Sequence, residues 1–189
     1  AAVYWPWLQI YDAVNGVKVW CPPSGFMAGV YAYSDNTTEV WFAPAGLTRG
    51  HLIQPIKAEY SPSLGERDLL YGNGNAINPI ATFKQDGINV WGQRTLQRLP
   101  TALDRINVRR TLLYLEKVLS TAVRGLLFEP NDPGTWTRLR RLVTPTLESL
   151  KTRRGLQDFK VVCDSTVNTP DVIEQNLLKA YIYVKPMKT

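Results

Sequence analysis

The clearest pattern of hydrophobic and polar positions in this chain lies between Asp104 and Leu127. An α-helix turns by about 100° per residue. On that geometry the apolar residues gather on one side, and they are Val108, Leu112, Leu115, Leu119, Val123 and Leu126. The pattern predicts a long amphipathic helix over about 104–127, with one packed face and one exposed face.

Three basic residues fall nearly opposite that apolar side. Arg110, Lys117 and Arg124 are seven residues apart, which is close to two helical turns, so they form a stripe along the predicted exposed face. Two interpretations are open, a solvated helix face and a docking surface for an acidic partner. Arg109 follows Val108 near the packed side, and we expect it to pair with a carboxylate inside the protein.

A second helix is predicted directly after a break at residues 130–133. Asp132 followed by Pro133 is a favourable N-cap and first position for a helix, which the pattern extends to about Thr152. Pro145 inside this helix predicts a kink. Cations near the end of the helix complement its dipole and need no partner.

The N-terminal half predicts shorter elements. Val3 to Tyr11 has the aromatic, roughly alternating character of a strand, in which Pro6 favours an edge or a bulge. Ser24 is predicted to cap a short helix through Tyr33, followed by a loop over 36–50. A second short helix is predicted from Ser61 to Gly72, with Pro62 at its first position and a buried side made of Leu64, Leu69 and Leu70.

The remaining strands complete a mixed α/β pattern. Residues 81–91 alternate like a hairpin with its turn at 85–87, after Asn78-Pro79 ends the preceding segment as a turn. Strands are expected at 158–164 and 181–185, with a short helix over 169–178 between them. The predicted fold is therefore α/β (mixed α+β), a mixed β-sheet packed against two main helices plus short helices. The order of the strands does not follow from the pattern.

Charge is distributed unevenly along the chain. Residues 94–154 hold thirteen Lys and Arg against five Asp and Glu, while the flanking segments contribute −2 and 0 to a formal net charge of +6. Such a concentration indicates a basic face and an acidic or polyanionic partner. A nucleic-acid-binding module is one reading, although the tryptophans at 5, 7, 20, 41 and 91 all precede the basic third and no binding motif is present.

Candidate chemistry is sparse. The single histidine, His51, lies in a predicted polar loop, and no nucleophile elbow, P-loop, dinucleotide fingerprint or zinc-protease motif occurs. Cys21 and Cys163 lack metal-ligand spacing and are expected to be buried thiols. Asn168 and Asp171 are expected to serve as turn and first-turn residues. We expect no enzyme activity and no catalytic, cofactor or metal site, and no apolar run is long enough to cross a membrane.

Several motifs together resemble one protein family. They are NVRR followed by a helix, FEPND and Trp136, and also PPSGFMAGVYAYSD at 22–35, APAG at 43–46, GINVWGQRTL at 87–96 and CDSTVNTPDVIEQN at 163–176. In this order they are similar to the C-terminal region of contractile bacteriophage tail sheath proteins. The resemblance spans nearly the whole chain and implies that residues 1–189 are a tube-proximal fragment of a larger chain. Residues 1–20 are a possible strand of the preceding domain.

The resemblance implies a structural role in a virion. Sheath subunits form stacked six-fold rings around a tail tube, and their contraction drives the tube through the host envelope for genome ejection. The family also implies assembly in the bacterial host cytoplasm, with other sheath subunits and the tail tube protein as partners, no cofactor and no membrane insertion. Arg110, Lys117 and Arg124 would then contact the tube. The resemblance does not distinguish a phage tail from a phage-derived bacteriocin or another injection device.

The family also links its subunits through β-strands added by extended terminal arms. This chain stops at KPMKT, and it begins without the outer domains that precede this region in the family. We therefore expect its sheet to keep at least one unpaired edge, and the isolated chain to be mainly monomeric at micromolar concentration.

Overall fold

The computed structural model describes residues 1–72 and 74–187. The chain divides into two compact units, Ala1–Arg110 and Thr111–Thr189. Both contain helices and strands, so the mixed α/β class is confirmed. The strands form three separate sheets of four, three and two strands.

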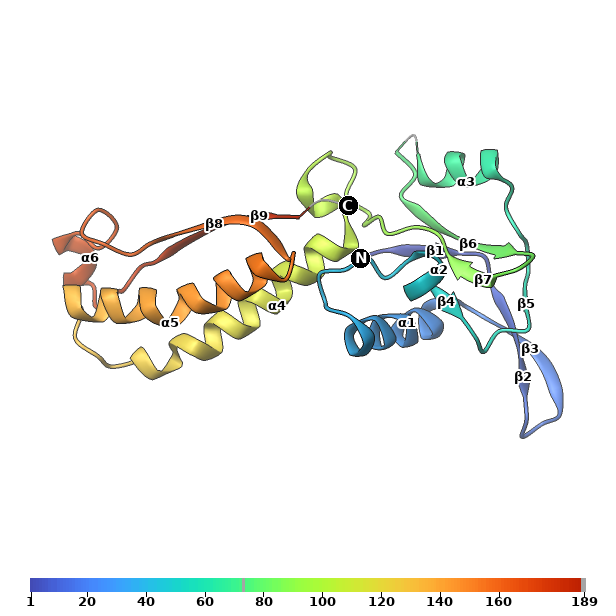
Figure 1. The fold of residues 1–189 in the computed structure, drawn as a ribbon, viewed down its shortest axis with the longest axis horizontal. Helices are drawn as coiled ribbons and strands as arrows, with labels where there is room; N and C mark the ends of the chain where they lie inside the picture. Colours follow the sequence, from blue (N-terminus) through green and yellow to red (C-terminus); the bar gives the residue numbers. More distant parts are fainter. Residues whose placement is uncertain (73, 188–189) are drawn as a thin grey trace. The chain divides into compact units, whose positions relative to one another are not determined.

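The first unit contains two of these sheets (Figure 1). The larger has the order β1 (Val3–Trp5), β6 (Ile77–Phe83), β7 (Gly87–Val90) and β4 (His51–Leu52). Only the β1–β6 pair is parallel. The smaller sheet is antiparallel and has the order β3 (Val17–Cys21), β2 (Leu8–Asp12) and β5 (Lys57–Ala58).

The predicted strand over residues 3–11 is divided between the two sheets at Pro6. Proline cannot donate a backbone hydrogen bond, so it weakens a continuous ladder. On either side of it, β1 pairs with β6 and β2 pairs with β3 and β5. The predicted hairpin is confirmed, with Phe83 opposite Gly87, but Asn78-Pro79 lies inside β6 rather than in a turn.

Three helices accompany these sheets, α1 (Ser24–Thr37), α2 (Gly46–Arg49) and α3 (Leu64–Tyr71). Helix α1 runs past the predicted end at Tyr33, and α2 interrupts the predicted 36–50 loop. Ser24 does not cap α1 but is its first residue. The core of this unit joins β2, α1 and the β4–β6–β7 strands, through Leu8, Met27, Val30, Leu52, Ala58, Ile80, Ile88 and Val90.

The buried side predicted for α3 is wrong for two of its three leucines, and only Leu70 is half-buried. Leu64 and Leu69 are 66% and 60% exposed. Arg67 is half-buried instead, because its guanidinium lies over the rings of Phe83 and Trp91. The helix begins at Leu64 through a capping box of Ser63 and Glu66, later than predicted.

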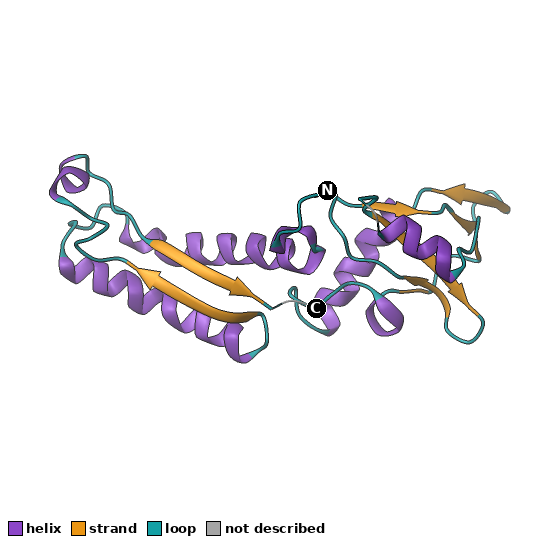
Figure 2. Cartoon of the chain, turned by 90° about the horizontal axis from the view of Figure 1, so that it is seen from above, coloured by secondary structure: helices purple, strands orange, loops and turns teal. Residues whose placement is uncertain are grey.

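The long helix α4 (Ile106–Val123) follows a short 3-10 turn, η1 (Ala102–Asp104), and ends in another, η2 (Arg124–Leu126). The second unit begins within α4 and continues with α5 (Pro133–Thr152), β8 (Leu156–Val162), α6 (Pro170–Glu174) and β9 (Tyr181–Pro186). The predicted helix start is confirmed, because the Asp132 side chain accepts a hydrogen bond from the Thr135 N–H at 2.7 Å. In Figures 1 and 2 the antiparallel β8–β9 ribbon lies along α5.

The packed face of α5 follows the helical period. Its buried apolar residues recur every three or four positions and are Trp136, Leu139, Val143, Leu147 and Leu150. Pro145 lies between them on an exposed position. On α4, Val108 and Leu115 are buried as predicted, while Leu112, Leu119, Val123 and Leu126 are half-buried. No helix in the described ranges is long and apolar enough to span a membrane.

Candidate interaction surfaces

Arg110 is not the exposed end of a basic stripe. Its Nη2 atom donates to both carboxylate oxygens of Asp35 at 2.6 Å, and its side chain is only 16% exposed. The guanidinium also lies 4.8 Å from the ring centroid of Tyr31, whose hydroxyl is 2.7 Å from that of Tyr4. The predicted outward position of Arg110 is therefore wrong, and the side chain joins α4 to α1.

Burial of polar residues explains this error. Asn107 and Thr111 are 2% and 1% exposed, and the Asn107 amide donates to the Trp41 carbonyl oxygen. They shift the packed face of α4 toward Arg110, which lies about 100° from Thr111 around the helix. Arg109 is correspondingly exposed, and the ion pairs found among the described residues do not include it, so its predicted internal pairing is also wrong.

Lys117 and Arg124 are exposed as predicted. Lys117 lies on α4, while Arg124 is the first residue of the 3-10 turn η2 that follows α4. The α-helical geometry behind the predicted stripe therefore ends before Arg124. These two residues remain available as an outward basic pair.

Further cations lie on α5. Arg138 pairs with Glu129 at 3.3 Å, and Lys151 pairs with Asp158 of β8 at 2.8 Å. Hydrogen bonds from Lys151 and the Phe159 backbone hold the pKa of the Asp158 carboxyl below its usual range. Arg140 and Arg141 are exposed on the same helix. The basic third of the sequence is thus partly neutralised locally.

The β8–β9 ribbon is a candidate surface for added strands. Its two strands pair only with each other among the described residues, so each has an open edge. The segment leading into β9 is held by Asn168, which is 2% exposed and exchanges two hydrogen bonds with the Lys179 backbone at 3.0 and 2.8 Å. Asp171 lies in the first turn of α6, so the turn roles expected for these two residues are confirmed.

The loop between η2 and α5 presents two apolar side chains to solvent. Leu127 is 67% exposed and Phe128 is 105% exposed. Phe128 has a φ of 68°, a left-handed conformation that is uncommon for a bulky residue. Sequence reasoning assigned this loop only to helix breaking and capping.

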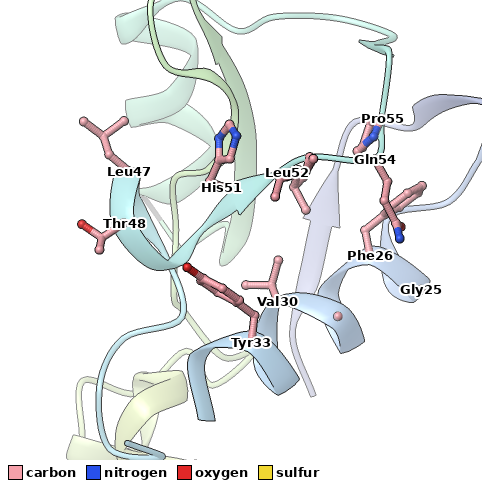
Figure 3. A pocket seen from close by; sticks show the side chains of 12 residues that line it. Gly25, Phe26, Val30, Tyr33, Leu47, Thr48, His51, Leu52, Gln54 and Pro55 are labelled. Carbon is pink, nitrogen blue, oxygen red and sulfur yellow. The ribbon is translucent and has the colours of Figure 1, made fainter. Parts of the chain in front are cut away.

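An apolar groove lies in the first unit between α1 and the Leu47–Pro55 segment. Its volume is about 350 Å³. Figure 3 shows Phe26, Val30 and Tyr33 extending from α1 toward the Leu47–Pro55 segment. The groove was not predicted from the sequence. Its signal is the pair Gly25 and Gly29, which are four residues apart and leave one face of α1 without side chains.

Among the residues that the structure describes, the titratable groups form no recognisable catalytic arrangement. His51 is exposed in β4, not in a loop, and its Nδ1 lies 3.3 Å from Asn89 Oδ1. Cys163 is buried, and burial raises the pKa of its thiol. Cys21 is half-buried, and both cysteines are free thiols. No group of three or more His, Cys, Asp or Glu side chains in the described part of the chain could hold a metal ion.

Comparison with known sequences finds similarity to tail sheath proteins of bacteriophages. Residues 100–189 match the family described as phage tail sheath C-terminal domain. The chain is 37% identical over 179 residues to the tail sheath protein of Vibrio phage KVP40, covering 95% of this chain and 26% of that protein. It is 35% identical to the tail sheath protein of Enterobacteria phage T4, covering 95% and 27%. The chain thus spans about a quarter of the length of these relatives.

Solved structures give a consistent result over the whole chain. The sheath complex of an extracellular contractile injection system, PVC, in its contracted state matches with a TM-score of 0.89 and 30% identity, covering 100% of this chain and 53% of that one. The contracted helical sheath of the anti-feeding prophage matches with a TM-score of 0.86 and 26% identity, covering 100% and 52%. The similar proteins are structural, and the nucleic-acid-binding alternative finds no support among them.

Proposed function

We propose that this chain, whose residues 100–189 match the phage tail sheath C-terminal domain family, is a structural part of a contractile tail sheath. It polymerises with copies of itself as stacked six-fold rings around a tail tube and transmits the contraction that drives the tube through the host envelope. The observation that carries this proposal is similarity over at least 95% of the chain to sheath proteins and sheath assemblies. Its location is the tail of a virion or a related injection device.

The role is mechanical rather than catalytic. It is supported by the similarity of the chain to tail sheath proteins and to a helical sheath. A structure of the protein with a cofactor or metal enclosed by several of its side chains would contradict this part of the proposal. Electron microscopy tests the positive part, since the assembled protein should form hollow cylinders with this domain on the inner wall.

Open strand edges supply the connection between subunits. β9 exposes Tyr181, Tyr183 and Lys185, and its backbone edge is available to a strand from another subunit. Without such strands the 189-residue chain should sediment mainly as a monomer at micromolar concentration. Stable hexamers or long polymers of the isolated chain would show that association does not depend on added strands.

Lys117 and Arg124 are the proposed contacts to an acidic tube surface. Exposed ionic contacts contribute about 0.2–1 kcal/mol each, so holding a sheath on a tube requires many repeated copies. Contacts this weak can also separate when the sheath widens. The sequence pattern placed Arg110 with these two residues. Because its side chain forms an ion pair with Asp35, we assign it to the internal structure instead.

Charge reversal tests this assignment. The double variant Lys117→Glu, Arg124→Glu should fold normally, because both side chains are exposed, but should fail to assemble on the tube. The matched control is Lys57→Glu, Lys84→Glu, which reverses two exposed cations in the first unit. Normal contractile assemblies from the first variant would show that the pair is a solvated helix face.

A further inference from the structure

Two features of this chain are apolar and exposed, the Phe128 side chain and the groove between α1 and the Leu47–Pro55 segment. We propose that Phe128 of one copy inserts into this groove on a second copy. The inference rests on the proposed function, because only a polymer places copies of the chain next to one another in a fixed arrangement.

The loop that carries Phe128 is anchored by hydrogen bonds of the residues that follow it. The Glu129 N–H donates to the Leu126 carbonyl oxygen, and the Glu129 carboxylate pairs with Arg138. Asn131, three residues after Phe128, accepts a 2.7 Å hydrogen bond from the Trp136 indole and donates to the Leu177 carbonyl oxygen. A side chain displayed outward in a left-handed conformation by such an anchored loop loses little conformational freedom on binding.

The groove fits an aromatic side chain. It is about 350 Å³ in volume, and its lining contains no Asp, Glu, Lys or Arg. Phe26 and Tyr33 supply aromatic walls (Figure 3), which favour tilted contacts with a third ring. A Cβ atom added at Gly25 or Gly29 would meet nothing within 4 Å, so the helix side of the groove is open.

Two properties indicate that the groove is occupied by a second copy within a polymer. They are the lack of charge on both surfaces and the small area that Phe128 would bury. Neither Leu127–Phe128 nor the groove lining carries a charged side chain, so no ion loses its hydration on contact. An inserted aromatic residue buries roughly 150–250 Å², far below the roughly 1,200–2,000 Å² of a stable pair of proteins. The contact is too small to hold a free dimer. Because Phe128 would bind a different surface on the neighbouring copy, the interface is heterologous, and such interfaces generate rings or open helices.

The test uses the longer sheath protein that contains residues 1–189, with Phe128→p-benzoylphenylalanine, a photo-cross-linking aromatic residue. Heavy-isotope-labelled and unlabelled copies are mixed before assembly, irradiated and analysed by mass spectrometry. We expect cross-links from position 128 to groove residues such as Leu47 and Ile53, with one labelled and one unlabelled partner. Cross-links within one copy, or to any other surface, would overturn the inference.

A groove-filling variant supplies the control. Gly29→Leu places a side chain in the groove, and Gly65→Leu on α3 is the matched control, because a Cβ there also meets nothing within 4 Å. The cross-link yield should fall at least about tenfold for Gly29→Leu, since losing burial of one large apolar side chain costs more than a factor of ten in binding. An equal yield from the two variants would overturn the inference. The assembly is made from the longer sheath protein that contains residues 1–189. Polymers of that protein with cross-links elsewhere refute this contact alone, whereas its failure to form polymers without any substitution refutes the proposed function and this contact with it.

Discussion

Replacing Arg110 by Met should destabilise the first unit, although the residue looks exposed in the sequence pattern. The substitution keeps an unbranched side chain but removes the bonds to Asp35 and the contact over the Tyr31 ring. Charge-assisted hydrogen bonds contribute about 1.5–3 kcal/mol, and fully exposed pairs only about 0.2–1 kcal/mol. Because the Arg110 and Asp35 side chains are 16% and 38% exposed, we expect a coupling near the lower end of the first range, about 1.5 kcal/mol.

A double-mutant cycle separates this coupling from the other losses. The cation–π contact with Tyr31 adds about 0.5–1 kcal/mol, so Arg110→Met should cost about 2–2.5 kcal/mol in total. Asp35→Asn should cost about 1.5 kcal/mol, and the double variant little more than Arg110→Met, because the pair is already lost. The difference between the summed single effects and the double effect is the coupling.

Urea unfolding followed by tryptophan fluorescence measures these free energies, since Trp41 is buried in the same unit. Lys117→Met is the matched control, and an exposed position should change stability by less than about 0.5 kcal/mol. A coupling below about 0.3 kcal/mol, or an effect of Lys117→Met equal to that of Arg110→Met, would refute the assignment of Arg110 to the internal structure.

Three further substitutions test other parts of the structure. Asn168→Ala should lower the stability of the second unit by about 1–3 kcal/mol in urea unfolding, because it removes two part-buried hydrogen bonds to the Lys179 backbone; a loss below about 0.5 kcal/mol would contradict this. Hydrogen bonds from the Thr135 N–H and side chain hold the pKa of Asp132 below its ordinary 3.8, so this carboxylate stabilises the folded state above that pH, and its contribution is lost as the pH falls through the folded-state value. The difference in Tm between wild type and Asp132→Ala should therefore shrink in increasingly acidic buffers, and a constant difference would count against the capping role. Gly92→Ala should destabilise far more than Gly65→Ala in thermal unfolding, because its Cβ would lie 2.8 Å from the side chain of a buried asparagine, and equal Tm values would argue against this packing.

Errors at the candidate surfaces have a common physical cause. The helical period of apolar residues located α4, but it did not count Asn107 and Thr111 as buried, because polar side chains are usually solvated unless they find partners. The packed face was therefore rotated, and the roles of Arg109 and Arg110 were exchanged. On α3 a half-buried arginine, stacked on aromatic rings, occupied the side that leucines were expected to cover.

The sequence by itself determined the features that depend on neighbours within a few residues. The cap and length of α5, the β6–β7 hairpin and the exposure of Lys117 follow from local hydrogen bonding and periodicity, so they were predicted from residue spacing. Its motifs also indicated a resemblance to tail sheath proteins, and residues 100–189 match the model of that C-terminal domain.

Only the tertiary structure decided which distant residues meet. Asp35 lies 75 positions from the arginine it binds, and the groove combines α1 with a segment some twenty residues further along the chain. The division of residues 3–11 between two sheets likewise depends on partner strands elsewhere in the chain. Such pairings are selected by the packing of the whole unit, since the free energy of each contact depends on burial that only the folded chain supplies.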